Sequence, residues 1–281
     1  MKEEHIHPLL RIVSYICLGA WTVCVVYPLV WTLFGALKNN EQIYMGKPWD
    51  LPKLPLHWEN FRYVWDEYHF GTYFWNSALV TIGSTALALL LSATTAYALA
   101  RFTFRGGKLL YVVYLSYMMI PMILGLIPLF FLLNDLGMTN TLWGLVVVYT
   151  ASSLPFGIFV LVGFFKMLPR DLEESASIDG ASLYRTFFSV MLPLARSGLA
   201  TVAIMNVLNI WNEYILGTVL VNDPTKYTLP VGLAVMQAEM QYRTEWGPLF
   251  SGLLLSVLPV LIVYILFQRT IARGITVGAV K

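Results

Sequence analysis

Residues 142–165 read LWGLVVVYTASSLPFGIFVLVGFF, a continuous stretch without Asp, Glu, Lys or Arg. A helix needs about 20 mostly apolar residues to cross the hydrocarbon core of a bilayer, and this stretch is long enough. Similar runs lie on both sides of it in the chain. We predict an all-α integral membrane protein with six transmembrane helices, at approximately residues 12–37, 75–100, 109–133, 142–165, 198–221 and 249–267.

The composition of the whole chain agrees with this class. Of its 281 residues, 58% are hydrophobic and only 12% are charged, against about 25% charged residues in a typical soluble domain. So few polar groups cannot cover a water-facing surface, which excludes an ordinary soluble enzyme. The first run exceeds the roughly 7–15 apolar residues of a signal peptide, so we expect it to remain as a spanning helix. One transmembrane domain over residues 1–281 is predicted.

The distribution of basic residues predicts the orientation of the chain. Twelve of the 18 Lys and Arg residues fall on one side of the predicted helices, and three of them lie in the short turn 101–108. The other side holds six, together with nine acidic residues. Because cytoplasmic loops carry the excess of Lys and Arg, both termini are predicted to be cytoplasmic.

The predicted cytoplasmic loop 166–197, between the fourth and fifth spans, is long for a connection between membrane helices. It reads KMLPRDLEESASIDGASLYRTFFSVMLPLARS. Pro169 and the acids after it favour a helix start, Gly180 favours a helix end, and Ser182 can cap a second helix. We predict a helix-turn-helix that stands out of the membrane and docks against another protein, since a hairpin this short is not stable alone.

The loop also carries a specific pattern. Glu174-Ser175-Ala176, three residues, Gly180, nine residues and then Val190-Met191-Leu192-Pro193 resembles the E-A-A-x3-G-x9-I-x-L-P loop of bacterial ATP-binding-cassette importer permeases. Ser175 replaces an Ala of that motif and Val190 replaces its Ile. Further segments are similar to the shorter, maltose-type permease of the sugar-importing branch: 76–77, 96–101, 104–106, 140–141, 178–182, 211–212, 228–233 and 274–281.

This resemblance implies a set of partners and a bacterial inner or plasma membrane as the location. The implied partners are a sister permease in a heterodimer, two copies of a cytoplasmic ATPase, an extracytoplasmic sugar-binding protein and the lipid bilayer, with no nucleic acid. In that family the loop helix sits in a groove of the ATPase and transmits its closure. The implied ATPase-coupling residues are Glu174, Ala176, Asp179, Gly180, Ala181 and Leu183.

Motifs of nucleotide binding and catalysis are missing from the sequence. No G-x-x-x-x-G-K-[ST] loop occurs, so ATP and Mg²⁺ are expected on the partner ATPase and no cofactor on this chain. The four histidines have no ligand spacing, so no metal site is predicted, and no G-x-S-x-G or H-E-x-x-H pattern is present. The chain is therefore predicted to be a transport subunit and not an enzyme.

Polar residues in the predicted fifth span are candidates for the translocation path. Asn206, Asn209 and Glu213 are spaced i, i+3 and i+7, which would place them on one helix face, and Trp211 and Asn212 flank them. A charge there costs about 2.5–3.5 kcal/mol on insertion scales, so Glu213 should face water or the bundle interior. Two interpretations remain open: a wet lining that contacts substrate, or hydrogen bonds between helices.

Two functions follow from these observations. The first is the membrane-spanning permease subunit of an ATP-driven, binding-protein-dependent importer of sugars, with oligosaccharides favoured, that forms half of the translocation pathway. The alternative is an ion-coupled secondary carrier that uses Glu213. Such carriers often show inverted repeats with broken helices. No matching halves are visible in this sequence.

Overall fold

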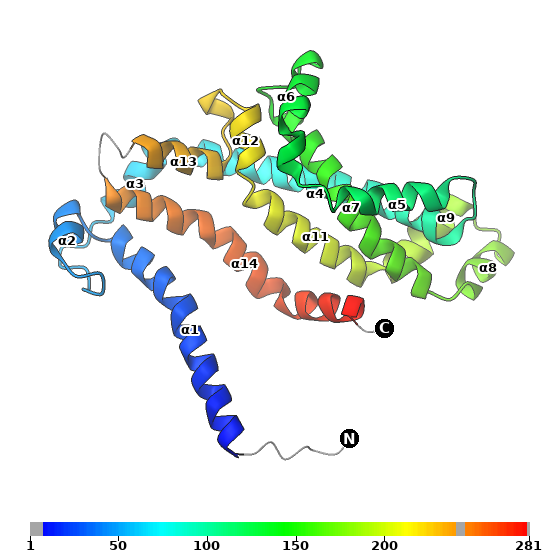
Figure 1. Ribbon diagram of the computed structural model, residues 1–281, viewed down its shortest axis with the longest axis horizontal. Helices are drawn as coiled ribbons and strands as arrows, with labels where there is room; N and C mark the ends of the chain where they lie inside the picture. The colour runs from blue at the N-terminus through cyan, green and yellow to red at the C-terminus, as the bar shows by residue number, and fades with distance from the viewer. Residues whose placement is uncertain (1–7, 240–244, 280–281) are drawn as a thin grey trace. The chain divides into compact units, whose positions relative to one another are not determined.

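The computed structural model describes the backbone of residues 8–239 and 245–279, and the side chains of residues 11–239 and 245–268. Within those ranges the chain forms helices and loops with no β-strand (Figure 1), which confirms the predicted all-α class. In chain order the segments are α1 (Pro8–Ala36), α2 (Asn40–Met45), α3 (Glu59–Asp66), α4 (Phe70–Arg101), α5 (Gly107–Tyr117), η1 (Met122–Gly125), α6 (Leu126–Asp135), α7 (Leu142–Met167), α8 (Asp171–Ile178), α9 (Leu183–Thr186), η2 (Phe187–Met191), α10 (Leu192–Leu194), α11 (Arg196–Trp211), α12 (Ile215–Leu220), η3 (Pro224–Lys226), α13 (Leu229–Glu239) and α14 (Trp246–Ala279).

The described helices fit a protein that crosses a membrane several times. Four of them are long and apolar enough to span a bilayer, and the number rises to six if each of two bent helix pairs is one span. The four continuous spans lie in α1, α4, α7 and α14, where the sequence predicts the first, second, fourth and sixth runs.

The third predicted run, 109–133, is not one helix. α5 ends at Tyr117, the chain resumes with η1 at Met122, and the two parts are bent by 100°. Pro121 explains the break, because proline has no N–H to donate and disfavours helical geometry in the residue before it. Pro155 and Pro259, in contrast, lie inside α7 and α14, which continue through them.

The fifth predicted run, 198–221, is broken as well. α11 ends at Trp211 and α12 begins at Ile215. α11 is also bent by 75° from the segment 183–194 that precedes it. Neither proline nor glycine stands at 212–214, so this break has another cause, which lies in the contacts of Glu213 described below.

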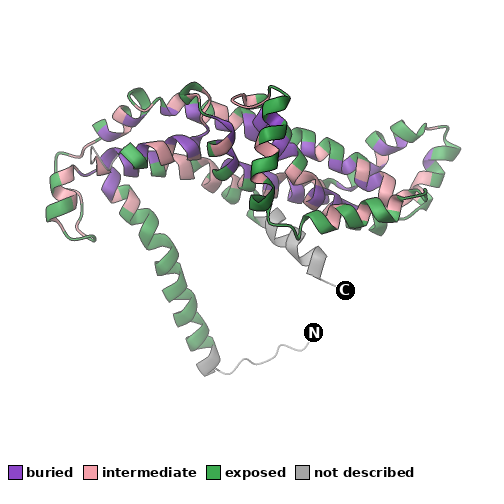
Figure 2. Ribbon diagram, turned by 45° about the horizontal axis from the view of Figure 1, so that its top comes forward, coloured by how far each residue is buried: buried purple, intermediate pink, exposed green. Residues whose placement is uncertain are grey.

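Contacts divide the chain into two units, each of which has its own packing. The first unit holds residues 1–70 and 233–258, and the second holds residues 71–232 and 259–281. In the first unit Trp31 packs edge-on against Phe250, with ring centroids 5.0 Å apart. The amide of Asn60 donates to the backbone oxygen of Ala36 at 2.9 Å, which ties α3 to the end of α1. The remainder of α1 is exposed along most of its length (Figure 2).

The second unit is built around α7, which packs against α5, α11 and α12. Its hydrophobic residues form two clusters, one that joins α4, α7, η2 and α11 and one that joins α4, α6, α7 and α12. Gly157 permits a close approach of α4 to α7, because a Cβ there would lie only 2.8 Å from the side chain of Ser92. These clusters fix the positions of the loop 166–197 and of the candidate path residues 206–213.

A loop after α12 is held by two asparagine side chains. Asn140 has a left-handed backbone (φ +58°), and its Oδ1 accepts from the backbone N–H groups of Asn222 and Asp223 at 3.1 and 2.9 Å. Asn76 donates to two backbone oxygens of the same loop at 3.0 Å. Hydrogen bonds from Thr225 and then Lys226 lower the pKa of Asp223 to about 2. Asp223 is therefore ionised at neutral pH and accepts hydrogen bonds from Thr225.

Candidate functional site: a helical elbow and a broken fifth span

Residues 171–186 form an elbow of two short helices, α8 and α9. Gly180 has φ +78°, a left-handed conformation that glycine adopts without a Cβ penalty. The N–H of Ala181 donates to the carbonyl of Ala176 at 2.9 Å and closes the end of α8. The hydroxyl of Ser182 then accepts from the N–H of Arg185 at 3.4 Å and caps α9.

The tip of the elbow is exposed and partly apolar. The exposed fractions of Ile178, Leu183 and Tyr184 are 86%, 64% and 80%. Of the residues predicted to couple to an ATPase, Glu174, Asp179, Gly180 and Leu183 are exposed, Ala181 is half-buried and Ala176 is buried. Exposed apolar side chains next to acidic ones form a surface of the kind that binds a protein partner.

Glu173 anchors the first arm of the elbow to α4. The hydroxyl of Tyr97 donates to Glu173 Oε1 at 2.6 Å, and Arg101 Nε lies 3.2 Å from Glu173 Oε2. This contact is an ion pair without an aligned hydrogen bond. The Nη2 group of Arg101 donates to the carbonyl of Leu168 at 2.8 Å. α8 is thus fixed to the end of the second spanning helix.

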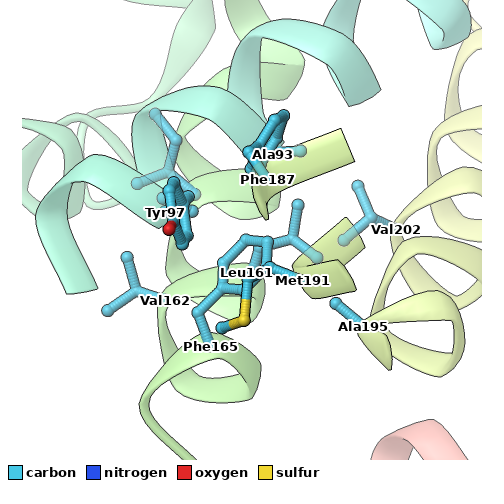
Figure 3. Packing of buried hydrophobic residues seen from close by; sticks show 11 residues of the cluster. Ala93, Tyr97, Leu161, Val162, Phe165, Phe187, Met191, Ala195 and Val202 are labelled. Carbon is cyan, nitrogen blue, oxygen red and sulfur yellow. The ribbon is translucent and has the colours of Figure 1, made fainter. Parts of the chain in front are cut away.

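The second arm is anchored in the hydrophobic core. Phe187 and Met191, from the π-helical turn η2, are 5% and 0% exposed. Figure 3 shows both side chains among residues of α4 and α7. The ring of Tyr97 lies 5.0 Å from that of Phe187 and 5.5 Å from that of Phe165. Both arms therefore meet at Tyr97, which contacts Glu173 of the first arm and Phe187 of the second.

The candidate path residues are not gathered on one helix face. The predicted i, i+3, i+7 stripe requires a continuous helix, but α11 ends at Trp211 and Glu213 lies beyond it. Asn206 is buried and Asn209 is exposed. Trp211 is buried against Phe74, with ring centroids 5.6 Å apart, and the exposed Asn212 donates to the carbonyl of Leu208 at 2.7 Å.

Glu213 instead supports the break in the fifth span. Its carboxylate accepts from the N–H groups of Leu216 at 2.8 Å and Gly217 at 3.1 Å, at the start of α12. The hydroxyl of Tyr149, on α7, donates to the same carboxylate. As the acceptor, the carboxylate satisfies two backbone N–H groups that a helix start leaves without partners. Of the two interpretations, these contacts of Glu213 fit hydrogen bonding between helices better than a lining that contacts substrate.

Sequence reasoning missed the three residues that anchor the elbow to α4, and it missed the tyrosine that hydrogen-bonds to Glu213. Tyr97 and Arg101 lie within the segment 96–101 that carries the family resemblance, and their i, i+4 spacing on one helix was an available signal. Glu173 stood among the acids at the start of α8. Tyr149 had no sequence signal, because its partner is 64 residues away. Across the described ranges no group of three His, Cys, Asp or Glu side chains could hold a metal ion.

The fold defines a class: a multi-pass helical membrane protein with an exposed pair of short helices. Comparison with known proteins supplies the family. The family described as "Binding-protein-dependent transport system inner membrane component" matches residues 88–277. The chain belongs to this family of transport permeases, which are not enzymes, and the resemblance noted in the sequence is confirmed.

Individual relatives are similar over nearly their whole length. The diacetylchitobiose uptake system permease protein NgcG of Streptomyces coelicolor is 41% identical over 96% of this chain and 88% of its own. The trehalose/maltose transport system permease protein MalG of Thermococcus litoralis is 31% identical over 100% of this chain and 99% of its own. A bacterial ABC transporter involved in import of the acidic polysaccharide alginate has a chain with TM-score 0.83 and 23% identity, covering 96% of this chain and 99% of its own, which shows a shared fold. The alternative of an ion-coupled carrier has no support among these relatives.

Proposed function

We propose that this chain is the permease subunit of an ATP-driven importer of sugars, and that oligosaccharides are its cargo. The class of cargo is supported by the names of the relatives, which include a diacetylchitobiose and a trehalose/maltose system. The family description makes transport dependent on a binding protein. The chain would sit in a bacterial inner or plasma membrane with both termini cytoplasmic, as the distribution of Lys and Arg predicts.

We further propose that the elbow is the contact with a cytoplasmic ATPase. The observation that carries this proposal is the exposed tip, where Ile178, Leu183 and Tyr184 have no apolar cover although both arms are anchored. An ATPase dimer that binds two such elbows would move them together when it closes on ATP and Mg²⁺. The anchors at Glu173 and Phe187 would pass this movement to α4 and α7, and a sister permease would supply the other half of the path.

The proposal is tested by two substitutions at the tip. Glu174→Arg reverses a charge at an exposed position, and Gly180→Pro imposes φ near −65° where the turn requires φ +78°. We expect both variants to insert in the membrane normally, to lose the ATPase on purification from native cells in mild detergent, and to lose sugar uptake.

The control is Thr103→Arg, which also introduces an arginine at an exposed position, in the turn before α5 and outside the elbow. It should retain the ATPase and normal uptake. Normal uptake in both elbow variants, or purification of the wild-type chain without any ATPase or second permease, would contradict the proposal.

A further inference from the structure

α3 connects the ends of two spanning helices in the first unit, and the transport mechanism above does not use it. Near its start, the amide of Asn60 donates to the carbonyl of Ala36, the last residue of α1. Near its end, the ring centroid of Trp65 lies 6.1 Å from that of Phe70, the first residue of α4. A spanning helix meets the membrane surface where its apolar run ends. Because both ends of α3 contact such residues, α3 lies along the membrane surface and not across it.

The start of a third spanning helix, α14, lies at the same level. A Cβ at Gly247 would collide with the amide of Asn60, so α14 begins directly beside α3. The indole Nε1 of Trp246 donates to the hydroxyl of Tyr44, on α2, at 2.8 Å. Trp and Tyr are enriched where membrane helices pass from hydrocarbon to water. The residues around α3 therefore have the composition of a membrane interface.

The side chains of α3 divide into three sectors around the helix. Asn60 and Val64 form a buried sector, since they are 9% and 0% exposed. Trp58, which has helical φ and ψ, lies within about 60° of Phe61 and Trp65 at about 100° per residue. We call these three residues the aromatic sector, and within it Trp58 and Trp65 are 62% and 49% exposed. An exposed charged sector lies beyond Trp58 and holds Glu59, Arg62, Asp66 and Glu67.

This order of sectors is typical of a helix that lies in a membrane interface. Such a helix buries its apolar face at the boundary between headgroups and acyl chains and turns its charged face to water. The headgroup region adds about 5–8 Å on each side of the hydrocarbon core, and α3 starts within a hydrogen bond of the end of α1. A soluble partner would have to enter this layer to cover the same rings, so the position of the aromatic sector favours lipid.

We propose that α3 is an interfacial anchor whose aromatic sector lies among phospholipid headgroups, in the leaflet on the side that the basic-residue count places outside the cytoplasm. The indole rings occupy the boundary with the acyl chains, where their apolar surface is covered and their N–H groups still reach polar atoms. The anchor holds the ends of α1 and α4 that contact α3 at one depth in the bilayer. The inference goes beyond the proposed function, since it depends on neither the cargo nor the ATPase.

Photo-crosslinking in native membranes tests this contact. The photoreactive residue p-benzoylphenylalanine is introduced in place of Trp58, Trp65 or Glu67, the membranes are irradiated, and the adducts on the purified chain are identified by mass spectrometry. All three positions are exposed, so the variants should insert normally. Glu67 is the matched control, because it belongs to the charged sector of the same helix. We expect phospholipid adducts at Trp58 and Trp65 to exceed those at Glu67 at least about tenfold, since the charged sector faces water.

A probe at Phe61 keeps the test decisive if a tryptophan variant does not insert. It adds only a benzoyl group to the phenylalanine already present, and it should form the same phospholipid adducts because Phe61 belongs to the aromatic sector. Equal lipid yields from the aromatic sector and from Glu67 would overturn the anchor. Crosslinking of the aromatic sector to the sugar-binding protein or another protein in place of lipid would overturn it as well, and so would the absence of any lipid adduct.

Discussion

Arg101 holds two parts of the elbow at once, since its Nη2 group donates to the carbonyl of Leu168 and its Nε group pairs with Glu173. The arginine side chain is 6% exposed and that of Glu173 is 20% exposed. Loss of the guanidinium leaves a largely buried carboxylate without its counter-charge, and the remaining bond from Tyr97 cannot replace it. Glu173→Gln is milder, because an amide oxygen can still accept from Tyr97.

We therefore predict that Arg101→Met loosens the elbow. Bonds to charged groups are worth about 1.5–3 kcal/mol, so trypsin cleavage at Arg185 in inside-out vesicles should accelerate at least about tenfold. Arg105→Met is the matched control, since it removes an exposed arginine from the neighbouring turn. Equal cleavage rates in the two variants would show that the ion pair does not hold the elbow.

At the scale of helices, local sequence determines some boundaries and distant contacts determine others. α7 was predicted within two residues, because Thr141 caps its start by accepting from Gly144 N–H at 3.0 Å and its apolar run is uninterrupted. The break before η1 follows from Pro121, a local signal. The break at 212–214 has no such signal, because it depends on Glu213 meeting a tyrosine from another helix. The elbow was predictable from Gly180 and Ser182. Its anchoring contacts were not, because they join residues far apart in the sequence, such as Tyr97 and Glu173.

The broken fifth span gives a test of what Glu213 does. If Glu213 caps α12, Glu213→Ala leaves two N–H groups and the Tyr149 hydroxyl without their acceptor. The complex should then lose about 1–3 kcal/mol of stability in detergent, whichever sugar is present. Asn209→Ala, at an exposed position of α11, should leave the melting temperature unchanged. A higher KM for uptake with unchanged melting in Glu213→Ala would assign it to the translocation path instead.

At the scale of the whole molecule, the spanning helices are covered very unevenly by the rest of the chain. Over its most apolar window, 56% of α7 is buried, but none of the corresponding window of α1 is. Apolar surface of this extent needs lipid or another membrane subunit to cover it. The tip of the elbow is a second exposed surface, and we propose that a soluble partner covers it. A chain with two such surfaces is not expected to transport alone.

Reconstituted vesicles separate a dependent subunit from a self-sufficient carrier. The chain alone, given a proton or sodium gradient, should take up no radiolabelled diacetylchitobiose or maltose. The complex purified from native cells should take up its sugar only with binding protein outside and ATP at the ATPase. The reason is that we propose coupling through the elbow, whereas the carboxylate of Glu213 already accepts hydrogen bonds from within the chain. A non-hydrolysable ATP analogue is the control and should stop uptake while the complex stays assembled. Gradient-driven uptake by the chain alone would contradict the assignment as a dependent subunit. It would favour an ion-coupled carrier that uses Glu213.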